Sequence, residues 1–357
     1  MSEPAIVATP EEAAALELEP LLVLRPLEAL LDAHGIGSGP IEATTVGEGH
    51  SNVTYLVRRE GAEVVLRRPP RGPLPPSAHD VLREARLLQA IAGTGVRVPA
   101  VLLACEDASV IGAPFYVMEK VEGVVMTSAI PDPLDTPAQR RAIADELIDA
   151  LVEVHACDWR AAGLEWFGKP DGYLDRQIRR FGGLWEHNKT RELPVLDRVT
   201  DWLRTNVPEQ QAATIVHGDY RLGNTMFAAD APARLRAIFD WELATIGDPL
   251  ADLGYLTATY PEPGDDTGAI FSLASVTTRE GFPARAELIA RYEERSGRSM
   301  RDVPWYTTLA LWKSAVFLEG SYKRLLAGTT DDPFFQMLDT AVPEIAERAW
   351  AVSQGDG

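Results

Sequence analysis

The chain has 357 residues, 46% of them hydrophobic and 24% charged, which suffices for a large buried core and excludes wholesale disorder. Its 34 Lys and Arg against 53 Asp and Glu give a net charge of −19, which disfavours a nucleic acid or an anionic membrane surface as partner. The sequence shows neither a run of ~18 apolar residues nor a basic leader, and its two cysteines are too few for a disulfide framework. These features predict a cytoplasmic protein with no membrane partner.

Three parts are predicted in chain order. Residues 1–20 are rich in Ala and Glu and predict a loose helix or a disordered tail. Residues 21–122 predict a small N-terminal lobe, because short β-like runs alternate there with Gly-rich and Pro-rich loops. Its strands are expected at 41–46, 53–58, 63–68, 101–103 and 115–118, and its one long helix from Ser77 to about Ala92.

Residues 123–357 predict a larger, mainly helical lobe. Thr136 is the expected N-cap of its first helix, with Pro137 at the first helical position. Residues 214–240 are expected to run as strand, loop, strand, turn and strand. Further helices are predicted at 173–187, 194–206, 249–258, 284–296, 303–326 and 333–350.

The strongest functional signal is the segment His217–Asn224, followed by Asp240 after an apolar run. An Asp and an Asn five residues apart in one loop can converge, and an Asp at the end of the next hairpin can join them. Asn224 and Asp240 offer oxygen ligands for Mg²⁺, which leaves Asp219 to accept a proton from an attacking hydroxyl. The order and spacing of these three residues are those of kinases that catalyse phosphoryl transfer, with Gly218 in the Arg position of the H-R-D signature. A polar turn without chemistry is the alternative for either loop residue alone.

A glycine-rich loop connects two of the predicted strands. Gly47 and Gly49 let backbone N–H groups approach phosphates closely, and Ser51 and Asn52 offer further donors. The loop is not a Walker A motif, and it lacks the G-x-S-x-G order of a nucleophile elbow, which argues against a serine hydrolase. Because most Gly-rich hairpins are only turns, the loop predicts a phosphate site only together with other signals.

A buried ion pair is predicted in the N-terminal lobe. Glu84 lies on the apolar stripe of the helix after Ser77, where an unpaired carboxylate is costly. The preceding strand ends in Arg67 and Arg68, and one of them is the expected partner. Kinases pair a strand Lys with a helix Glu in this order. The segment 58–71 carries five arginines against two glutamates, which suggests local anion binding; a solvated basic hairpin is the alternative.

From about residue 27 to 350 the chain resembles the aminoglycoside phosphotransferase family of small-molecule kinases. It is most like the branch that includes the kinase-like modules associated with acyl-CoA dehydrogenases. The resemblance implies an α+β, two-lobed protein-kinase-like fold with ATP, or GTP, between the lobes. It implies Asp219 as catalytic base and Asn224 and Asp240 as Mg²⁺ ligands. The residues that carry it are 217–224, 240–244 and 247–253, supported by 49–52, 65–70 and 118–123.

The resemblance also assigns residues to the nucleotide. Backbone groups near Glu119 and Val121 would meet the base. Arg67, paired with Glu84, falls where most kinases carry the Lys that touches the phosphates. Arg in place of Lys at this position is expected to affect the rate of phosphoryl transfer, because the guanidinium is a planar fork of donors and the ammonium is a compact point charge. Arg221 would supply a second cation near the transferred phosphate.

The predicted function is ATP- and Mg²⁺-dependent phosphorylation of a hydroxyl on a small molecule, either aminoglycoside-like or of hydroxyacyl type, by a monomer or homodimer. The alternative is a non-catalytic nucleotide-binding pseudokinase, which Arg67 favours and the catalytic-loop residues oppose. A metal-dependent hydrolase that uses the same aspartates is a third hypothesis. Candidates for the acceptor pocket are Trp312, Lys313, Glu319 and Tyr322.

Overall fold

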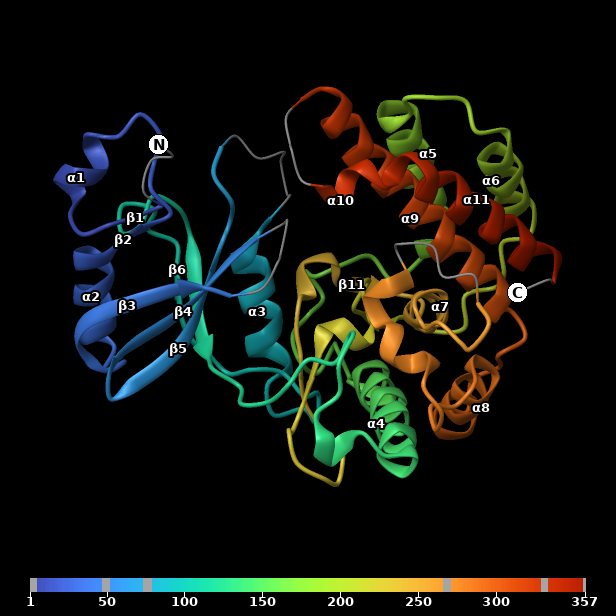
Figure 1. Ribbon diagram of the computed structural model, residues 1–357, viewed down its shortest axis with the longest axis horizontal. Helices are drawn as coiled ribbons and strands as arrows, with labels where there is room; N and C mark the ends of the chain where they lie inside the picture. Colours follow the sequence, from blue (N-terminus) through green and yellow to red (C-terminus); the bar gives the residue numbers. More distant parts are fainter. Residues whose placement is uncertain (1–4, 47–51, 73–78, 266–270, 329–332, 356–357) are drawn as a thin grey trace. The chain divides into compact units, whose positions relative to one another are not determined.

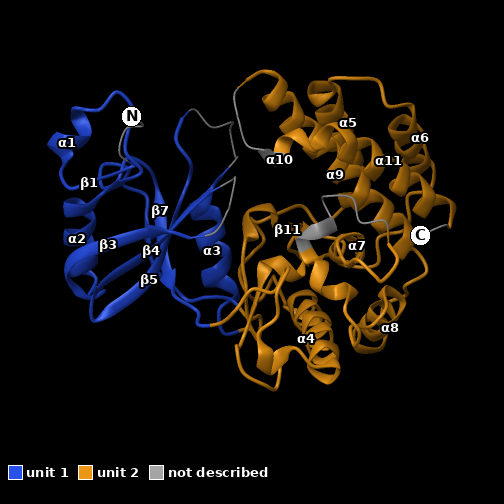
Figure 2. Cartoon of the chain, in the orientation of Figure 1, with its two compact units in different colours: residues 1–93, 98–122 blue, residues 94–97, 123–357 orange. Residues whose placement is uncertain are grey.

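The computed structural model describes residues 5–46, 52–72, 79–265, 271–328 and 333–355. The chain divides into two compact units, coloured separately in Figure 2. Unit 1 comprises residues 1–93 and 98–122, and unit 2 comprises residues 94–97 and 123–357. Unit 1 is built on an antiparallel sheet, whereas unit 2 is mostly helical (Figure 1), which gives the mixed α+β class predicted from the sequence.

The sheet of unit 1 has five strands in the order β3-β4-β5-β7-β6, and all neighbours are antiparallel. Alternate residues of the central strands point into the core; Tyr55, Leu66 and Val117 are fully buried there. The turn between β4 and β5 contains Gly61 at φ 78°, a backbone conformation that favours glycine. The strands are β3 (Ser38–Thr45), β4 (Val53–Glu60), β5 (Ala62–Arg68), β6 (Val101–Cys105) and β7 (Phe115–Glu119).

Helix α3 (Val81–Ile91) packs on β6 and β7. Asp80 is its N-cap, and the Asp80 side chain accepts a hydrogen bond from the Arg83 N–H at 2.9 Å. The N-cap of the helix is therefore three residues later than predicted, and the predicted cap, Ser77, lies outside the described residues. The buried face of α3 includes Glu84.

The N-terminal segment, predicted as a loose helix or a disordered tail, contains short regular elements. Strand β1 (Ile6–Val7) pairs in parallel with β2 (Leu22–Val23). Between them, helix α1 (Pro10–Ala14) is closed by a capping box in which Thr9 and Glu12 bond each other's backbone N–H. Helix α2 (Leu24–Ala33) follows and contacts β3.

Unit 2 is organised around α9, which contacts helices α5, α6, α7 and α11. Gly254 of α7 allows the close approach to α9, because a Cβ there would lie 2.5 Å from the Tyr306 backbone. The unit's helices are α4 (Pro137–Ala156), α5 (Tyr173–Asn188), α6 (Pro194–Thr205), α7 (Leu250–Ala258), α8 (Arg285–Ser296), α9 (Val303–Leu326), α10 (Pro333–Gln336) and α11 (Leu338–Gln354).

These helices match the predicted ranges except at the C-terminus. The single helix expected at 333–350 is divided into α10 and α11, and α11 runs on to Gln354. No helix among the described residues is long and apolar enough to cross a membrane.

Two short antiparallel strand pairs of unit 2 carry the functional segment. Strand β8 (Thr214–Val216) pairs with β11 (Thr245–Gly247), and β9 (Thr225–Phe227) pairs with β10 (Leu235–Ile238). The loop after β8 contains Asp219 and Asn224, and Asp240 follows β10. The order strand, loop, strand, turn and strand therefore places the three polar residues at strand ends.

Candidate functional site

Asp219 and Asn224 converge in the loop between β8 and β9. The Asn224 side-chain amide donates to the Asp219 carboxylate Oδ2 at 2.7 Å and to the Asp219 backbone carbonyl at 2.8 Å. The other carboxylate oxygen, Oδ1, is buried and has no hydrogen-bond partner among the described residues; the Arg221 Nε lies 3.5 Å from it. One oxygen of Asp219 is thus held by a hydrogen bond, whereas the other forms an ion pair with Arg221 and accepts no hydrogen bond from a described residue.

His217 braces this loop and stays away from solvent. Its Nδ1 accepts a hydrogen bond from the Asp219 N–H at 3.2 Å, and its Nε2 donates to the Phe239 carbonyl at 2.8 Å. Its ring packs against Trp241, with the centroids 4.6 Å apart. Both ring nitrogens are therefore engaged by backbone groups, which holds the loop in place.

Asp252 of α7 holds the loop between β8 and β9 through hydrogen bonds from the loop backbone. Its carboxylate accepts from the backbone N–H groups of His217 at 2.7 Å and Gly218 at 2.8 Å, and His155 Nε2 lies 3.2 Å away. Burial would raise the pKa of Asp252, but the hydrogen bonds and the histidines hold that pKa below its ordinary value. Gly218 itself has φ 88°, and a Cβ there would lie 2.8 Å from the Leu243 carbonyl oxygen. The position therefore requires glycine where the kinase signature has arginine.

Asp240 is tied to the same loop through its neighbour. The Phe239 N–H donates to the Asn224 carbonyl at 2.9 Å, while the Phe239 carbonyl accepts from His217. Asp240 adopts φ 65°, in the left-handed region that non-glycine residues occupy uncommonly, although Asp tolerates it better than most. It is half-buried. Asp219, Asn224 and Asp240 are therefore held in one constellation by hydrogen bonds on both sides of Phe239.

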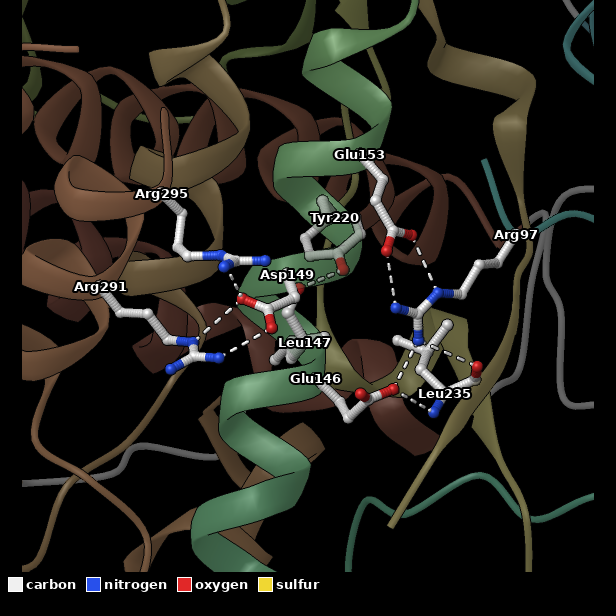
Figure 3. Close-up of polar contacts among 9 residues, drawn as sticks. All are labelled: Arg97, Glu146, Leu147, Asp149, Glu153, Tyr220, Leu235, Arg291 and Arg295. Atoms are coloured by element: carbon white, nitrogen blue, oxygen red, sulfur yellow. Dashed lines mark hydrogen bonds and ion pairs between the residues drawn. The ribbon is translucent and has the colours of Figure 1, made fainter. Parts of the chain in front are cut away.

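Helix α4 contacts both the loop and Arg97 (Figure 3). The Tyr220 hydroxyl, next to Asp219, donates to the Leu147 carbonyl at 2.6 Å. Arg97 pairs with Glu146 and Glu153 of α4 and donates to the Leu235 carbonyl of β10 at 3.1 Å. The Ile238 N–H in turn donates to the Arg97 carbonyl. Arg97 thus ties α4 to the strand that leads to Asp240.

We expect Arg97→Met to destabilise the protein by about 2 kcal/mol, because it leaves Glu146 and Glu153 as neighbouring unpaired carboxylates. The loss should stay below the ~3–5 kcal/mol of a deeply buried pair, since the three side chains are 23%, 27% and 36% exposed. Urea denaturation measures the difference. Arg141→Met is the matched control, because its partner Glu287 is half-exposed. Equal losses in both variants would contradict a structural role for Arg97.

In unit 1 the structure brings Arg67 and Glu84 together. The Arg67 Nε lies 3.0 Å from the Glu84 carboxylate, and their side chains are 13% and 1% exposed. Arg68, the other candidate, points to the opposite side of β5 and donates to the Ile111 carbonyl at 3.1 Å. The partner of the carboxylate on the apolar stripe is therefore Arg67.

A double-mutant cycle tests the energetic coupling of this pair. Arg67→Met and Glu84→Leu should each cost about 3 kcal/mol, because each leaves a buried charge unpaired. The double variant should cost less than the sum of the two, since no orphaned charge remains. The exposed pair Arg58 and Glu63 provides the control, with single losses of about 0.5 kcal/mol or less. Additive losses for Arg67 and Glu84 would show that the pair contributes no coupling.

Only some of the other residues predicted to bind the nucleotide lie among the described residues. Gly47, Gly49 and Ser51 lie outside the described residues, whereas Asn52 is buried at the start of β4. The Glu119 N–H donates to the Ala100 carbonyl, and the Glu119 carboxylate accepts from the Ala100 N–H at 3.0 Å. Val121 is half-buried, and its backbone forms no hydrogen bond with another described residue.

The predicted acceptor candidates have different environments. Trp312 is fully buried, and Glu319 is buried and pairs with Arg191. Tyr322 bonds Asp339 through its hydroxyl. Lys313 alone of the four lines a pocket that also contains Gly218. Sequence reasoning missed the aromatic walls of this pocket, because Tyr173, Tyr255 and Tyr306 come from separate helices and share no motif.

Comparison with known proteins identifies the family. The model of a phosphotransferase enzyme family matches residues 42–301. The chain belongs to this family. Acyl-CoA dehydrogenase family member 10 of Mus musculus is 35% identical over 333 residues, which cover 93% of this chain and 31% of the mouse protein. The chain thus spans about a third of the length of that relative, and the resemblance to the acyl-CoA-dehydrogenase-associated branch is confirmed.

Two solved structures define the fold of this phosphotransferase-family member. A candidate aminoglycoside phosphotransferase from Ralstonia eutropha superposes with a TM-score of 0.79 at 33% identity, covering 92% of this chain and 98% of that chain. Aminoglycoside phosphotransferase APH(4)-Ia, in a complex with AMP-PNP and hygromycin B, gives a TM-score of 0.59 at 15% identity over the same shares. The second likeness shows the fold alone. Together they confirm the predicted kinase-like architecture.

Proposed function

We propose that this family member transfers the γ-phosphate of ATP, or GTP, to a hydroxyl group of a small molecule. The observation that carries the proposal is the state of Asp219. Its Oδ2 is held by Asn224, while its buried Oδ1 has no hydrogen-bond donor among the described residues. A buried acceptor without a donor is costly in a folded protein, and a substrate hydroxyl would satisfy it.

In the proposed reaction, Asp219 accepts the proton of the acceptor hydroxyl as that oxygen forms its bond to the γ-phosphorus. The bond from the γ-phosphorus to the bridging oxygen breaks, and the nucleoside diphosphate leaves. Asn224 orients the Asp219 carboxylate through the 2.7 Å hydrogen bond. Arg221, 24% exposed beside Asp219, offers positive charge to the transferred phosphoryl group.

Asn224 and Asp240 are the proposed ligands of a magnesium ion. The side-chain amide nitrogen of Asn224 donates to Asp219. The side-chain oxygen of Asn224, which accepts no hydrogen bond from a described residue, is therefore available to a hard cation. Asp240 supplies a carboxylate from the strained position that follows β10. The described residues contain no cluster of three or more His, Cys, Asp or Glu ligands, which suits a metal held mainly by phosphate oxygens. Bound Mg²⁺ would neutralise charge on the phosphates.

Residues of unit 1 are proposed to serve the nucleotide. Arg67, fixed by Glu84, would contact the phosphates, with Asn52 and the neighbouring glycine loop as further donors. Backbone groups of Glu119 and Val121 would meet the base. The acceptor, either aminoglycoside-like or of hydroxyacyl type, and a cytoplasmic monomer or homodimer stay predictions from the sequence.

A metabolite-extract screen with γ-labelled ATP tests the function. We expect label to move to a hydroxylated small molecule in the presence of Mg²⁺, and to stay on the nucleotide with EDTA. Binding of Mg·ATP without label transfer to any acceptor would instead support the pseudokinase alternative. Hydrolysis of a substrate without ATP would support the hydrolase alternative.

A further inference from the structure

A small pocket of unit 2 adjoins the catalytic loop. Its walls come from α5, α7 and α9, and its floor includes Gly218, the residue before Asp219. Its lining is aromatic and aliphatic, with one charged group, the ammonium of Lys313. The lining residues are Tyr173, Gly218, Ala251, Tyr255, Tyr306, Leu309, Ala310 and Lys313.

Lys313 has an unusual environment for a lysine. Its Nζ lies over the Phe181 ring, 4.7 Å from the centroid, and it forms no ion pair or hydrogen bond with any described residue. Burial, and secondarily the repulsion from Arg180, lowers the pKa of Lys313 to about 8. Contact with an aromatic face compensates only part of the cost of burying an ammonium.

The surrounding charges do not supply the missing anion. Asp252 and Asp219 act on Lys313 only as distant attractive charges. Both Asp252 oxygens accept from the catalytic loop, and Asp219 pairs with Arg221. Arg180, on α5 beside Phe181, also forms no ion pair with a described carboxylate. In a chain with a net charge of −19, two cations without acidic partners therefore lie together near the proposed base.

The tyrosines of the pocket stay neutral. Burial raises the pKa of Tyr173 and of Tyr306, and the Tyr306 hydroxyl donates to Asp248 at 2.9 Å. Burial, followed by the charge of Asp219, raises the pKa of Tyr255. Because no phenolate forms, the pocket carries net positive charge when Lys313 is protonated, and a polycationic acceptor would meet repulsion there.

We propose that Lys313 receives an anionic group of the acceptor, a carboxylate or a phosphate, while the acceptor hydroxyl faces Asp219. The substrate class is then a hydroxylated acid and not a polyamine such as an aminoglycoside. The inference rests on the proposed phosphotransferase function, and it assigns Lys313 the selection of the acceptor.

Steady-state kinetics with matched acceptors test the selection. Short hydroxycarboxylates and hydroxyalkyl phosphates are compared with the diol and the amino alcohol of equal chain length, with Mg·ATP saturating. We expect the anionic acceptors to have a kcat/KM about tenfold or more above the others, which is the usual effect of one charged hydrogen bond. Lys313→Met should remove this preference mainly through KM, and Lys313→Arg should keep it. A preference for the amino alcohol, or an equal loss with all acceptors in Lys313→Met, would overturn the proposal.

Chemical labelling tests the anion site without turnover. The rate of Lys313 acetylation by an N-hydroxysuccinimide ester is followed against pH by peptide mass spectrometry, with acetate or inorganic phosphate as probe. We expect half-maximal reactivity near pH 8 in the free protein and at higher pH with the probe, because a bound anion stabilises the ammonium. Lys323, exposed on the same helix, is the internal control.

The two experiments separate the two proposals. A probe-dependent shift at Lys313 without phosphorylation of any acceptor would support the anion site and count against the phosphotransferase function. Phosphorylation of neutral acceptors without a shift at Lys313 would support the function and overturn the anion site. Carboxylate and phosphate probes, compared separately, identify which of the two groups the site prefers.

Discussion

Replacing Asp219 with Asn is expected to lower phosphoryl transfer by roughly 10²–10⁴-fold, the usual contribution of a positioned general base. Asn keeps the size of the side chain and can still bond Asn224, but its amide cannot take a proton from the acceptor. The buried Oδ1, which has no described hydrogen-bond donor in the native protein, is the atom whose basicity is lost. Release of nucleoside diphosphate is measured with the acceptor identified by label transfer, at saturating substrates.

The control for this prediction is Asp230→Asn, an exposed position in the turn between β9 and β10 whose carboxylate pairs with Arg234. It should leave turnover unchanged. Nucleotide affinity, measured by the shift of the melting temperature with Mg·ATP, should be the same in Asp219→Asn and the native protein. Turnover near the native rate in Asp219→Asn would remove the base assignment and leave the loop as a structural turn.

Local sequence patterns predicted most of the fold. The helices of unit 2 are strongly periodic and begin at recognisable caps, such as Thr136, so their predicted limits are close to the observed ones. Two features depended on contacts that a linear pattern does not contain. The N-terminal β1 forms because β2, whose residues lie sixteen positions further along the chain, pairs with it. The start of α3 is set by the Asp80 side chain, and because Asp caps a helix about as well as Ser, the sequence alone does not choose between Asp80 and Ser77.

For the candidate site, too, the sequence predicted some contacts and left others undecided. The spacing of Asp219 and Asn224 within one loop predicted their contact, because five residues suffice to close the hydrogen bond that the structure shows. The apolar stripe of α3 identified Glu84 as a residue in need of a cation, but the choice between Arg67 and Arg68 required the strand's orientation.

The supporting contacts were beyond the reach of local patterns. Asp252 reaches the loop between β8 and β9 from α7, and Arg97 reaches α4 and β10 from a different part of the chain. Lys313 lines the same pocket as Gly218 because α9 packs there in the folded chain. Such long-range contacts decide the electrostatics of the site, and no short motif encodes them.

Substitution of Asp240 should abolish the part of ATP binding that depends on Mg²⁺, because it deletes the only carboxylate among the proposed metal ligands. In the native protein, ATP with Mg²⁺ should raise the melting temperature more than ATP with EDTA, following RT ln(1 + [L]/Kd). At a ligand concentration of 100 Kd this term is about 2.7 kcal/mol, which corresponds to a shift of several degrees.

Two variants at position 240 distinguish the loss of a metal ligand from the effect of backbone strain. Asp240→Ala removes the carboxylate but also places alanine at φ 65°, where an L-residue costs roughly 1–2 kcal/mol. Asp240→Asn removes the charge and tolerates the left-handed conformation, so its own melting temperature should stay near the native value. Both variants should lose the Mg²⁺ increment, whereas Asp230→Ala should retain it. If the increment survives in Asp240→Asn and Asp240→Ala alike, the metal binds elsewhere, and the strained backbone of Asp240 must serve the packing of Trp241 instead.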